Sequence, residues 1–280
     1  MIADTLKNFI RKVTPKFIFN FIIKQRNKKF REFADFILAS AVEFSKSVKG
    51  DPDSFDRRLT KLLKTGEGMC NEIIQDILSA FMPDFEHNLY DFYKNQQYLI
   101  FYRFLQYPFI NNMSNYTVPY ENALIKCGKA DILDYGSGIP FGLIYSLLNR
   151  KETVRSVTLI DLDLIHVDFV QFLVKKIAPE VNLKIHRLTD ADTFPKLEGK
   201  YNFFFGKDIF EHLSDPLKNL KELMKYSQPE AICYFDFRDH GVKLYQHITP
   251  DIEFLKDEMV KMGFTHGGRV QNLSEFTRNL

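Results

Sequence analysis

The sequence places glycines and an acid at the end of a short apolar run, in a spacing that suits ligand binding. The run ends in Asp134-Tyr135-Gly136-Ser137-Gly138, and a helical pattern follows at once. Glycines there let a backbone turn tightly and approach a ligand with no Cβ in the way. The pattern predicts a ligand held against the main chain at this strand-to-helix turn.

Two more acids follow the next two apolar runs. Asp161 ends the second run, where a carboxylate can accept hydrogen bonds from both hydroxyls of a ribose. Asp190 and Ala191 follow the third run, where a side chain or a backbone group can reach the edge of an adenine. Because these features occur in order along one alternating pattern, they predict an adenosine site.

Titratable side chains follow the fourth and fifth runs. Lys207 and Asp208 end the fourth, and His240 and His247 lie in the segment after the fifth. An unperturbed imidazole titrates near neutral pH, so the two histidines, with Asp208, are predicted to handle a proton; solvated loop histidines are the alternative. The predicted substrate contacts are Arg238 and Tyr245 of that segment, and Tyr107, Tyr116 and Tyr120 before the first run.

The elements that must position these residues follow from the apolar pattern. Strand-length apolar runs alternate with helical patterns, which predicts an α/β fold with a Rossmann-like, doubly wound, mostly parallel sheet. The predicted strands are Ile132–Tyr135, Val157–Ile160, Leu183–Leu188, Tyr201–Phe205 and Ile232–Phe237. The predicted helices between and after them are Leu143–Asn149, Leu164–Ile177, Leu217–Tyr226 and Ile252–Met262.

The region before the first strand has the spacing of helices only. Capping and stop signals predict helices over about 54–66, 71–83 and 89–105, and Asn111–Tyr120 is predicted to be a loop. We therefore expect residues 1–127 to form an all-helical N-terminal cap or dimerisation domain, and residues 128–280 to form the ligand-binding domain.

Composition narrows the function classes. The 280 residues are 45% hydrophobic, and the net charge of +2 lacks the basic excess typical of proteins that bind nucleic acid. The three cysteines are far apart, which favours a reducing, cytoplasmic setting. Phe17–Ile23 is the longest apolar run, and it is too short to span a bilayer.

Basic residues are concentrated in the first 31 positions, interleaved with Ile and Phe: Lys7, Arg11, Lys12, Lys16, Lys24, Arg26, Lys28, Lys29 and Arg31. Two interpretations are open. The region is either a helical cap whose apolar stripe packs on the core or on a second copy of the chain, which we favour, or a peripheral contact with an anionic membrane.

The second half resembles the class I S-adenosylmethionine (SAM)-dependent methyltransferases. The resemblance covers roughly residues 128 to 264 and rests on the Asp134–Gly138 turn, Asp161, Asp190 and the stretch Phe205–Pro216. It implies SAM as cofactor. Its methionine end would lie near Asp134 and Gly136, its ribose on Asp161, and its adenine near Asp190. The further predicted cofactor contacts are Ser137, Gly138, Leu162, Ala191 and Lys207.

The same residues leave other cofactors and functions as alternatives. Gly136, Gly138 and Gly142 also suit a dinucleotide, but Asp134 would repel a pyrophosphate, whereas SAM carries an ammonium group. We expect methyl transfer to an oxygen or nitrogen of a small molecule. The alternatives are a non-catalytic scaffold of the same fold, which would bind a membrane or a partner, and a methyltransferase for protein or RNA.

Overall fold

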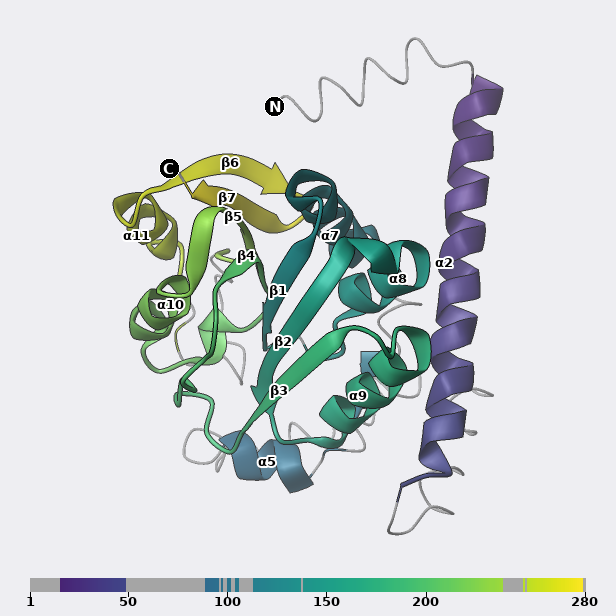
Figure 1. Ribbon diagram of the computed structural model, residues 1–280, viewed down its shortest axis with the longest axis horizontal. Coiled ribbons are helices and arrows are strands. Elements are labelled where there is room, and N and C mark those ends of the chain that lie inside the picture. Colours follow the sequence, from purple (N-terminus) through teal and green to yellow (C-terminus); the bar gives the residue numbers. More distant parts are fainter. Residues whose placement is uncertain are drawn as a thin grey trace.

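The structure, a computed structural model, describes residues 16–48, 89–95, 97, 100, 101, 104, 105, 113–136, 138–238, 249 and 251–278. These residues form one seven-stranded sheet with helices on both faces (Figure 1). The predicted α/β, doubly wound fold is confirmed. The helices predicted over 54–66 and 71–83 lie outside the described residues.

The strands run in the order β3-β2-β1-β4-β5-β7-β6 across the sheet. Their bounds are β1 Ala130–Tyr135, β2 Val154–Leu162, β3 Asn182–Leu188, β4 Tyr201–Gly206, β5 Ser227–Phe235, β6 Phe264–Val270 and β7 Leu273–Arg278. The first five are parallel, as predicted, and β7 is antiparallel to both β5 and β6. Because β1 starts the sheet and later strands add on either side of it, the strand order reverses between β1 and β4.

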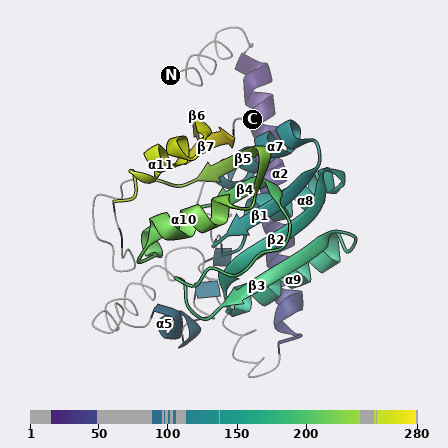
Figure 2. The same cartoon turned by 60° about the vertical axis from the view of Figure 1, so that its left-hand side comes forward.

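Helices cover each face of the sheet, as Figures 1 and 2 show. Their bounds are α2 Lys16–Ser45, α5 Leu89–Asn95, α7 Ser114–Cys127, α8 Phe141–Arg150, α9 Ile165–Ile177, α10 Pro216–Met224 and α11 Leu255–Lys261, with short 3₁₀ turns η2 Lys151–Thr153 and η3 Phe210–His212. The described residues between 97 and 105 are also helical, as predicted. None of the described helices is long and apolar enough to cross a bilayer.

Two hydrophobic cores result from the alternation of side chains along the strands. In β4, Phe203 and Phe205 belong to the core beneath α7, α8 and α9, whereas Phe204 belongs to the core beneath α10 and α11. A period of two sends neighbouring side chains to opposite faces. An uninterrupted run of phenylalanines is therefore what a strand buried on both faces requires.

Helix α10 shows why the chain turns where it does. The Asp215 carboxylate accepts a hydrogen bond from the backbone N–H of Lys218 at 2.9 Å, and Pro216 is the first helical residue. An aspartate N-cap binds a backbone donor that has no partner within the helix, and proline suits the first position because it has no N–H to satisfy.

The prediction of a loop over Asn111–Tyr120 was wrong, because α7 begins at Ser114 and includes Pro119. Proline removes one backbone hydrogen bond and was taken as a stop signal. The helix forms nonetheless because one side of it is buried: Tyr116, Tyr120, Ala123 and Leu124 belong to the core beneath α8. Tertiary packing therefore outweighs the local signal here.

Helix α2 packs against α8 and α9 through its second half. Phe33 lies edge-on to Tyr145 of α8 at 5.4 Å between ring centroids, and Phe44 lies 5.4 Å from Phe169 of α9. In Figure 1 the first half of α2 runs on past α8. The second half thus shares the core of the sheet, and the interpretation of the basic segment Lys7–Arg31 as a helical cap stays a prediction.

Candidate functional site

The site lies where the carboxyl ends of β1, β2 and β4 meet, at the reversal of strand order. Ligands of open α/β sheets bind at such a point. Gly136 and Gly138 follow β1 with φ of +66° and +61°, a region that favours glycine. A Cβ on Gly136 would come within 2.4 Å of the Ile209 side chain, and one on Gly138 within 2.9 Å of the Phe104 ring. Side chains from two distant segments thus pack closely over the glycine turn.

Asp134 at the end of β1 is buried and accepts a hydrogen bond from the hydroxyl of Tyr120. Tyr120 is fully buried as well, and burial together with the Asp134 carboxylate raises the pKa of its hydroxyl well above the ordinary value. The hydroxyl therefore stays protonated and donates a hydrogen bond to the Asp134 carboxylate. Sequence analysis predicted Tyr120 as a substrate contact; the structure shows that it binds Asp134.

Asp161 lies at the end of β2, beside the glycine turn. Its Oδ2 accepts a hydrogen bond from Gly138 N at 2.9 Å, and its Oδ1 accepts one from Leu162 N at 2.8 Å. A carboxylate offers about four lone-pair sites, so acceptor capacity remains for a further donor. Asp161 and the glycine turn are thus brought together as the sequence predicted.

A small pocket, with room for about one water molecule, lies next to these two acids. It is lined by Asp134, Gly138, Pro140, Leu159, Ile160, Asp161, Val167 and Val170. One wall comes from the glycine turn, the floor from β2, and the other wall from α9. Two carboxylates on an otherwise apolar lining favour a ligand that presents hydroxyl or ammonium groups.

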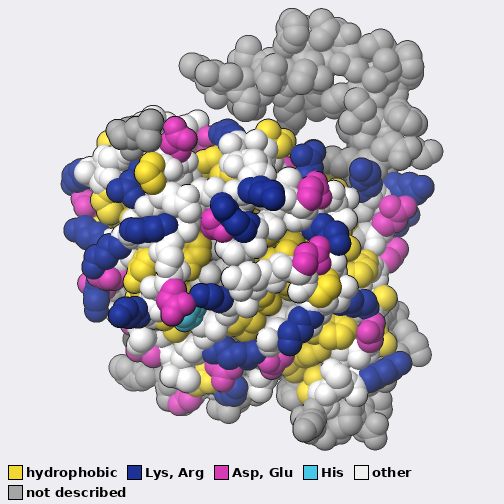
Figure 3. Space-filling model, viewed as in Figure 1, with side chains coloured by type: hydrophobic (Ala, Val, Ile, Leu, Met, Phe, Trp, Pro, Cys, Tyr) yellow, Lys and Arg dark blue, Asp and Glu magenta, His cyan; other side chains and the backbone are white. Residues whose placement is uncertain are grey.

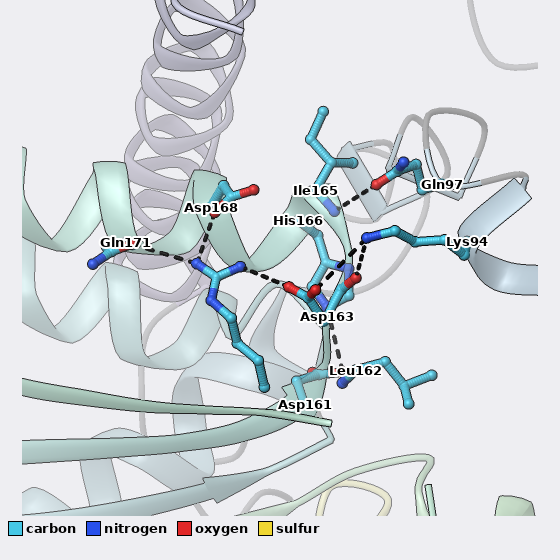
Figure 4. A network of polar contacts seen from close by, with 10 residues as sticks. Lys94, Gln97, Asp161, Leu162, Asp163, Ile165, His166, Asp168 and Gln171 are labelled. Atoms are coloured by element: carbon cyan, nitrogen blue, oxygen red, sulfur yellow. Dashed lines mark hydrogen bonds and ion pairs between the residues drawn. The ribbon is translucent and has the colours of Figure 1, made fainter. Parts of the chain in front are cut away.

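The loop after Asp161 is held by two residues from before the sheet, Lys94 and Gln97, and by Arg187 of β3. Lys94 of α5 donates to the backbone oxygen of Asp163 at 2.7 Å, and Arg187 of β3 donates to the Asp163 carboxylate at 3.1 Å. Gln97 accepts a hydrogen bond from the N–H of Ile165, the first residue of α9, at 3.1 Å. Figure 4 shows Lys94 and Gln97 reaching the same loop from one side. The N-terminal segment therefore fixes the end of β2.

Asp190 and Ala191 follow β3. The Asp190 carboxylate accepts hydrogen bonds from Asp192 N at 3.0 Å and from the Thr193 hydroxyl at 2.9 Å, so it caps its own turn. Ala191 packs against the core beneath α10 and α11. The contacts of Asp190 are thus within its own turn.

Charged groups gather at the ends of β4 and β5. Lys207 donates to the carboxylate of Asp208, and Arg238 donates through two nitrogens to the fully buried Asp236. An Arg238 nitrogen also lies 3.5 Å from Asp208 Oδ1. Asp208 itself has a φ of +53°, which is rare for a residue with a Cβ. Strained backbone of this kind is concentrated at functional sites.

Burial and neighbouring charges shift the pKa values of the acids in this cluster in different directions. Burial would raise the pKa of Asp208, but the neighbouring Lys207 and Arg238 outweigh it and hold that pKa below its usual value. Burial raises the pKa of Asp236, against the effect of Arg238. Burial and the nearby Asp208 raise the pKa of Glu211 of η3 to about 8. The cluster thus holds an acid that can exchange a proton near neutral pH.

Tyr116 connects this cluster with the N-terminal half. The Lys207 ammonium lies over the Tyr116 ring, 4.9 Å from its centroid, and Tyr116 belongs to α7. A cation over an aromatic face is favourable and counteracts the burial of Lys207. Lys207 is therefore held by Asp208 and Tyr116.

Within the described part of the chain, no group of acids, histidines and cysteines has the arrangement of a metal site.

Five predicted site residues lie outside the described residues: Tyr107, Ser137, His240, Tyr245 and His247. Sequence analysis missed others that the structure brings to the site. Glu211 was noted only as part of the Phe205–Pro216 stretch, Asp236 as part of a strand, and His166 as part of a helix. Phe104 and Gln97 carry no signal in the sequence, because contacts across more than thirty residues leave no local pattern.

Comparisons with known proteins gave only distant structural similarities. Neither a family model nor a curated protein matches this sequence. Among solved structures, the cyclase SpnF is 14% identical, with a TM-score of 0.45 over 55% of this chain and 57% of its own. A SAM-dependent methyltransferase from Aquifex aeolicus is 21% identical, with a TM-score of 0.43 over 60% of this chain and 91% of its own.

A methyltransferase from Pyrococcus furiosus is 14% identical, with a TM-score of 0.41 over 59% of this chain and 83% of its own. This chain thus matches little more than half the length of the cyclase. Because these similarities are distant, the reaction has to be inferred from the residues at the ends of β1, β2, β4 and β5.

Proposed function

We propose that this protein is a SAM-dependent methyltransferase that acts on a small molecule. One observation carries the proposal. Asp134 and Asp161, at the ends of the neighbouring parallel strands β1 and β2, line one pocket next to the Gly136–Gly138 turn. Two acids next to the turn suit an ammonium group and a ribose diol, and they oppose a pyrophosphate.

The residues present fit this cofactor. Asp161 keeps acceptor capacity beyond its bonds to Gly138 and Leu162, as a ribose diol requires. Asp134 is held in one orientation by Tyr120, and its buried negative charge would attract the ammonium group. We assign the adenine side to Asp190 and Ala191. When bound, SAM supplies an electrophilic methyl group on a sulfonium.

The acceptor side of the site is assigned to the charged cluster of Lys207, Asp208, Glu211, Asp236 and Arg238. Methyl transfer requires an aligned nucleophile and, for a hydroxyl or a protonated amine, a group that takes the proton. Asp208 stays ionised and orients cations, whereas Glu211, with a pKa of about 8, is mostly protonated at neutral pH and accepts a proton only in its minor ionised form. Tyr116 and Arg238 would contact the acceptor, and His240 and His247 stay predictions from the sequence.

A small acceptor fits the way in which the N-terminal segment covers the site. Phe104 lies over Gly138, Gln97 binds the start of α9, and Tyr116 lies against Lys207. A covered site excludes water and admits only a compact acceptor. We place the protein in the cytoplasm, which agrees with the free Cys127 and Cys233 of the described residues.

Binding of SAM and of S-adenosylhomocysteine (SAH) to the full chain, measured by isothermal titration calorimetry, tests the proposal. We expect micromolar binding by the wild type and a loss of about tenfold or more for Asp161→Asn, which removes a charged acceptor. Asp168→Asn is the matched control, because Asp168 is exposed and bonded to Arg187 rather than to the pocket. Absence of heat for the wild type at millimolar SAM would refute the cofactor and favour a non-catalytic scaffold.

A further inference from the structure

A buried histidine lies against the acid that we assign to the ribose. His166 is the second residue of α9 and is 2% exposed. Its Nε2 lies 3.3 Å from Asp161 Oδ1, but the alignment is not that of a hydrogen bond, and within the described structure this nitrogen has no hydrogen-bond partner. A buried polar atom without a partner destabilises a fold, so its presence calls for an explanation.

The imidazole lies next to residues that line the pocket. Phe104, whose ring covers Gly138, also meets the imidazole edge-to-face at 5.3 Å between ring centroids. The next residue of α9, Val167, lines the pocket together with Asp161. In Figure 4, His166 lies beside the loop that carries Asp161 and Asp163. His166 is therefore fixed on a rigid helix, next to one oxygen of the Asp161 carboxylate.

The other donors to Asp161 explain what this nitrogen could do. Gly138 N bonds to Oδ2, and Leu162 N bonds to Oδ1. If the carboxylate rotates toward a diol in the pocket, its bond to Gly138 weakens. A donor on the opposite side of Oδ1 then compensates, and His166 Nε2 is already within reach at 3.3 Å. A small rotation of the carboxylate would align the two groups.

We infer that His166 is a positioning residue for Asp161: it donates from Nε2 to Oδ1 and holds the carboxylate toward the two hydroxyls of a nucleoside. The inference rests on the proposed function, because the nucleoside is the one that SAM carries. His166 acts through Asp161 and needs no contact with the ligand. The imidazole must carry its proton on Nε2, which is one of its two neutral tautomers.

Two substitutions separate this role from a role in packing. His166→Phe keeps the ring and removes the donor, whereas His166→Gln keeps a donor close to the place of Nε2. By calorimetry, we expect His166→Phe to weaken SAH binding about tenfold and His166→Gln to stay within about threefold of the wild type. His186→Phe is the control, since His186 lies on β3 with partial burial.

A second comparison tests whether the effect passes through Asp161. In the Asp161→Asn background, His166→Phe should weaken SAH binding by less than about twofold, because the carboxylate that it positions is gone. Wild-type SAH affinity in His166→Phe would overturn the inference. An equal loss of affinity in both backgrounds would overturn it too, because that result indicates a packing effect.

Urea unfolding without any ligand separates this inference from the proposed function. The four proteins to compare are the wild type, His166→Phe, Asp161→Asn and the double variant. Coupling between His166 and Asp161 should make the two shifts in unfolding midpoint non-additive. If the wild type binds no SAH, the proposed function fails, and the unfolding data alone decide about the pair. Non-additive shifts then retain the His166–Asp161 coupling, and additive shifts exclude it.

Discussion

The carboxyl groups of Asp134 and Glu211 are both buried, but their surroundings differ. The Asp134 carboxylate accepts a hydrogen bond from the Tyr120 hydroxyl. Glu211 is 1% exposed and lies near the negative charges of Asp208 and Asp236, so that its protonated form is favoured and its pKa rises to about 8. The first arrangement preserves a fixed charge and the second creates a group that can exchange a proton.

Replacing Tyr120 by Phe should lower the free energy of unfolding by about 1–3 kcal/mol, because the buried carboxylate of Asp134 loses a donor. Urea unfolding followed by circular dichroism measures this. In the Asp134→Asn background the same substitution should cost clearly less. An equal cost in both backgrounds would mean that the hydroxyl acts through packing and not through Asp134.

Glu211→Gln should change how stability depends on pH. Because the folded pKa of Glu211 is raised from 4.5 to about 8, the folded protein holds this proton more tightly than the unfolded chain. The resulting stabilisation is complete below pH 4.5 and is lost as the pH rises to about 8, by at most about 1.4 kcal/mol per pH unit.

The free energy of unfolding of the wild type, relative to Glu211→Gln, should therefore fall between pH 5 and pH 8. Urea unfolding at three or four pH values provides the comparison, and the difference between the two proteins cancels the titration of other groups. Parallel pH profiles for the two proteins would show that Glu211 titrates at its ordinary pKa.

At the scale of elements, the site depends on how helices begin. Helix α10 begins with a capping carboxylate of its own, Asp215, whereas α9 takes its first acceptor from Gln97, far away in the chain. The first device is encoded locally and the second exists only in the folded protein. The end of β2 and the start of α9, which carry Asp161 and His166, are consequently held by the N-terminal half.

Asp215→Ala should lower the free energy of unfolding by about 1 kcal/mol, because the backbone N–H of Lys218 loses its acceptor. Asp215→Asn, which can still cap, should stay within a few tenths of the wild type. Chemical denaturation of the three proteins measures both effects. If Asp215→Asn lowers the free energy of unfolding as much as Asp215→Ala does, the negative charge of Asp215, and not its hydrogen bond to Lys218, stabilises the helix.

At the scale of the whole molecule, the N-terminal helices are continuous with the core of the sheet. Phe44 of α2, Phe101 and Tyr120 belong to the same hydrophobic cluster as Phe169 of α9 and Phe203 of β4. On the face seen in Figure 3, basic and acidic side chains are interspersed over the described surface, in keeping with a net charge of +2. The described helices and the sheet should therefore unfold together.

Phe44→Ala should shift the whole unfolding transition by about 3–5 kcal/mol without splitting it, because it opens a cavity between α2 and α9. Far-ultraviolet circular dichroism and tyrosine fluorescence are suitable probes, since the chain has 13 tyrosines and no tryptophan. Coincident transitions are expected from both probes. Two separated transitions would show that the helical part and the sheet unfold independently.

The five parallel strands and the outline of the site could be predicted from the sequence. Five largely apolar runs predicted the parallel strands, because the central ones are buried on both faces, and Gly136, Gly138 and Asp161 were identified because they end or follow such runs. The hairpin β6–β7 was missed, since Phe264–Val270 is largely exposed and polar. The helix at Ser114–Cys127 was missed because Pro119 signals a stop.

Only the tertiary structure decided which groups touch. Tyr120 meets Asp134, Phe104 covers Gly138, and His166 lies against Asp161, and none of these pairs is encoded by spacing along the chain. The physical reason is that burial and pairing set the chemistry of a polar side chain, and both depend on residues that are distant in sequence. The pKa of Glu211 is an example. In the unfolded chain this side chain is hydrated and is an ordinary acid, and burial in the folded protein raises its pKa.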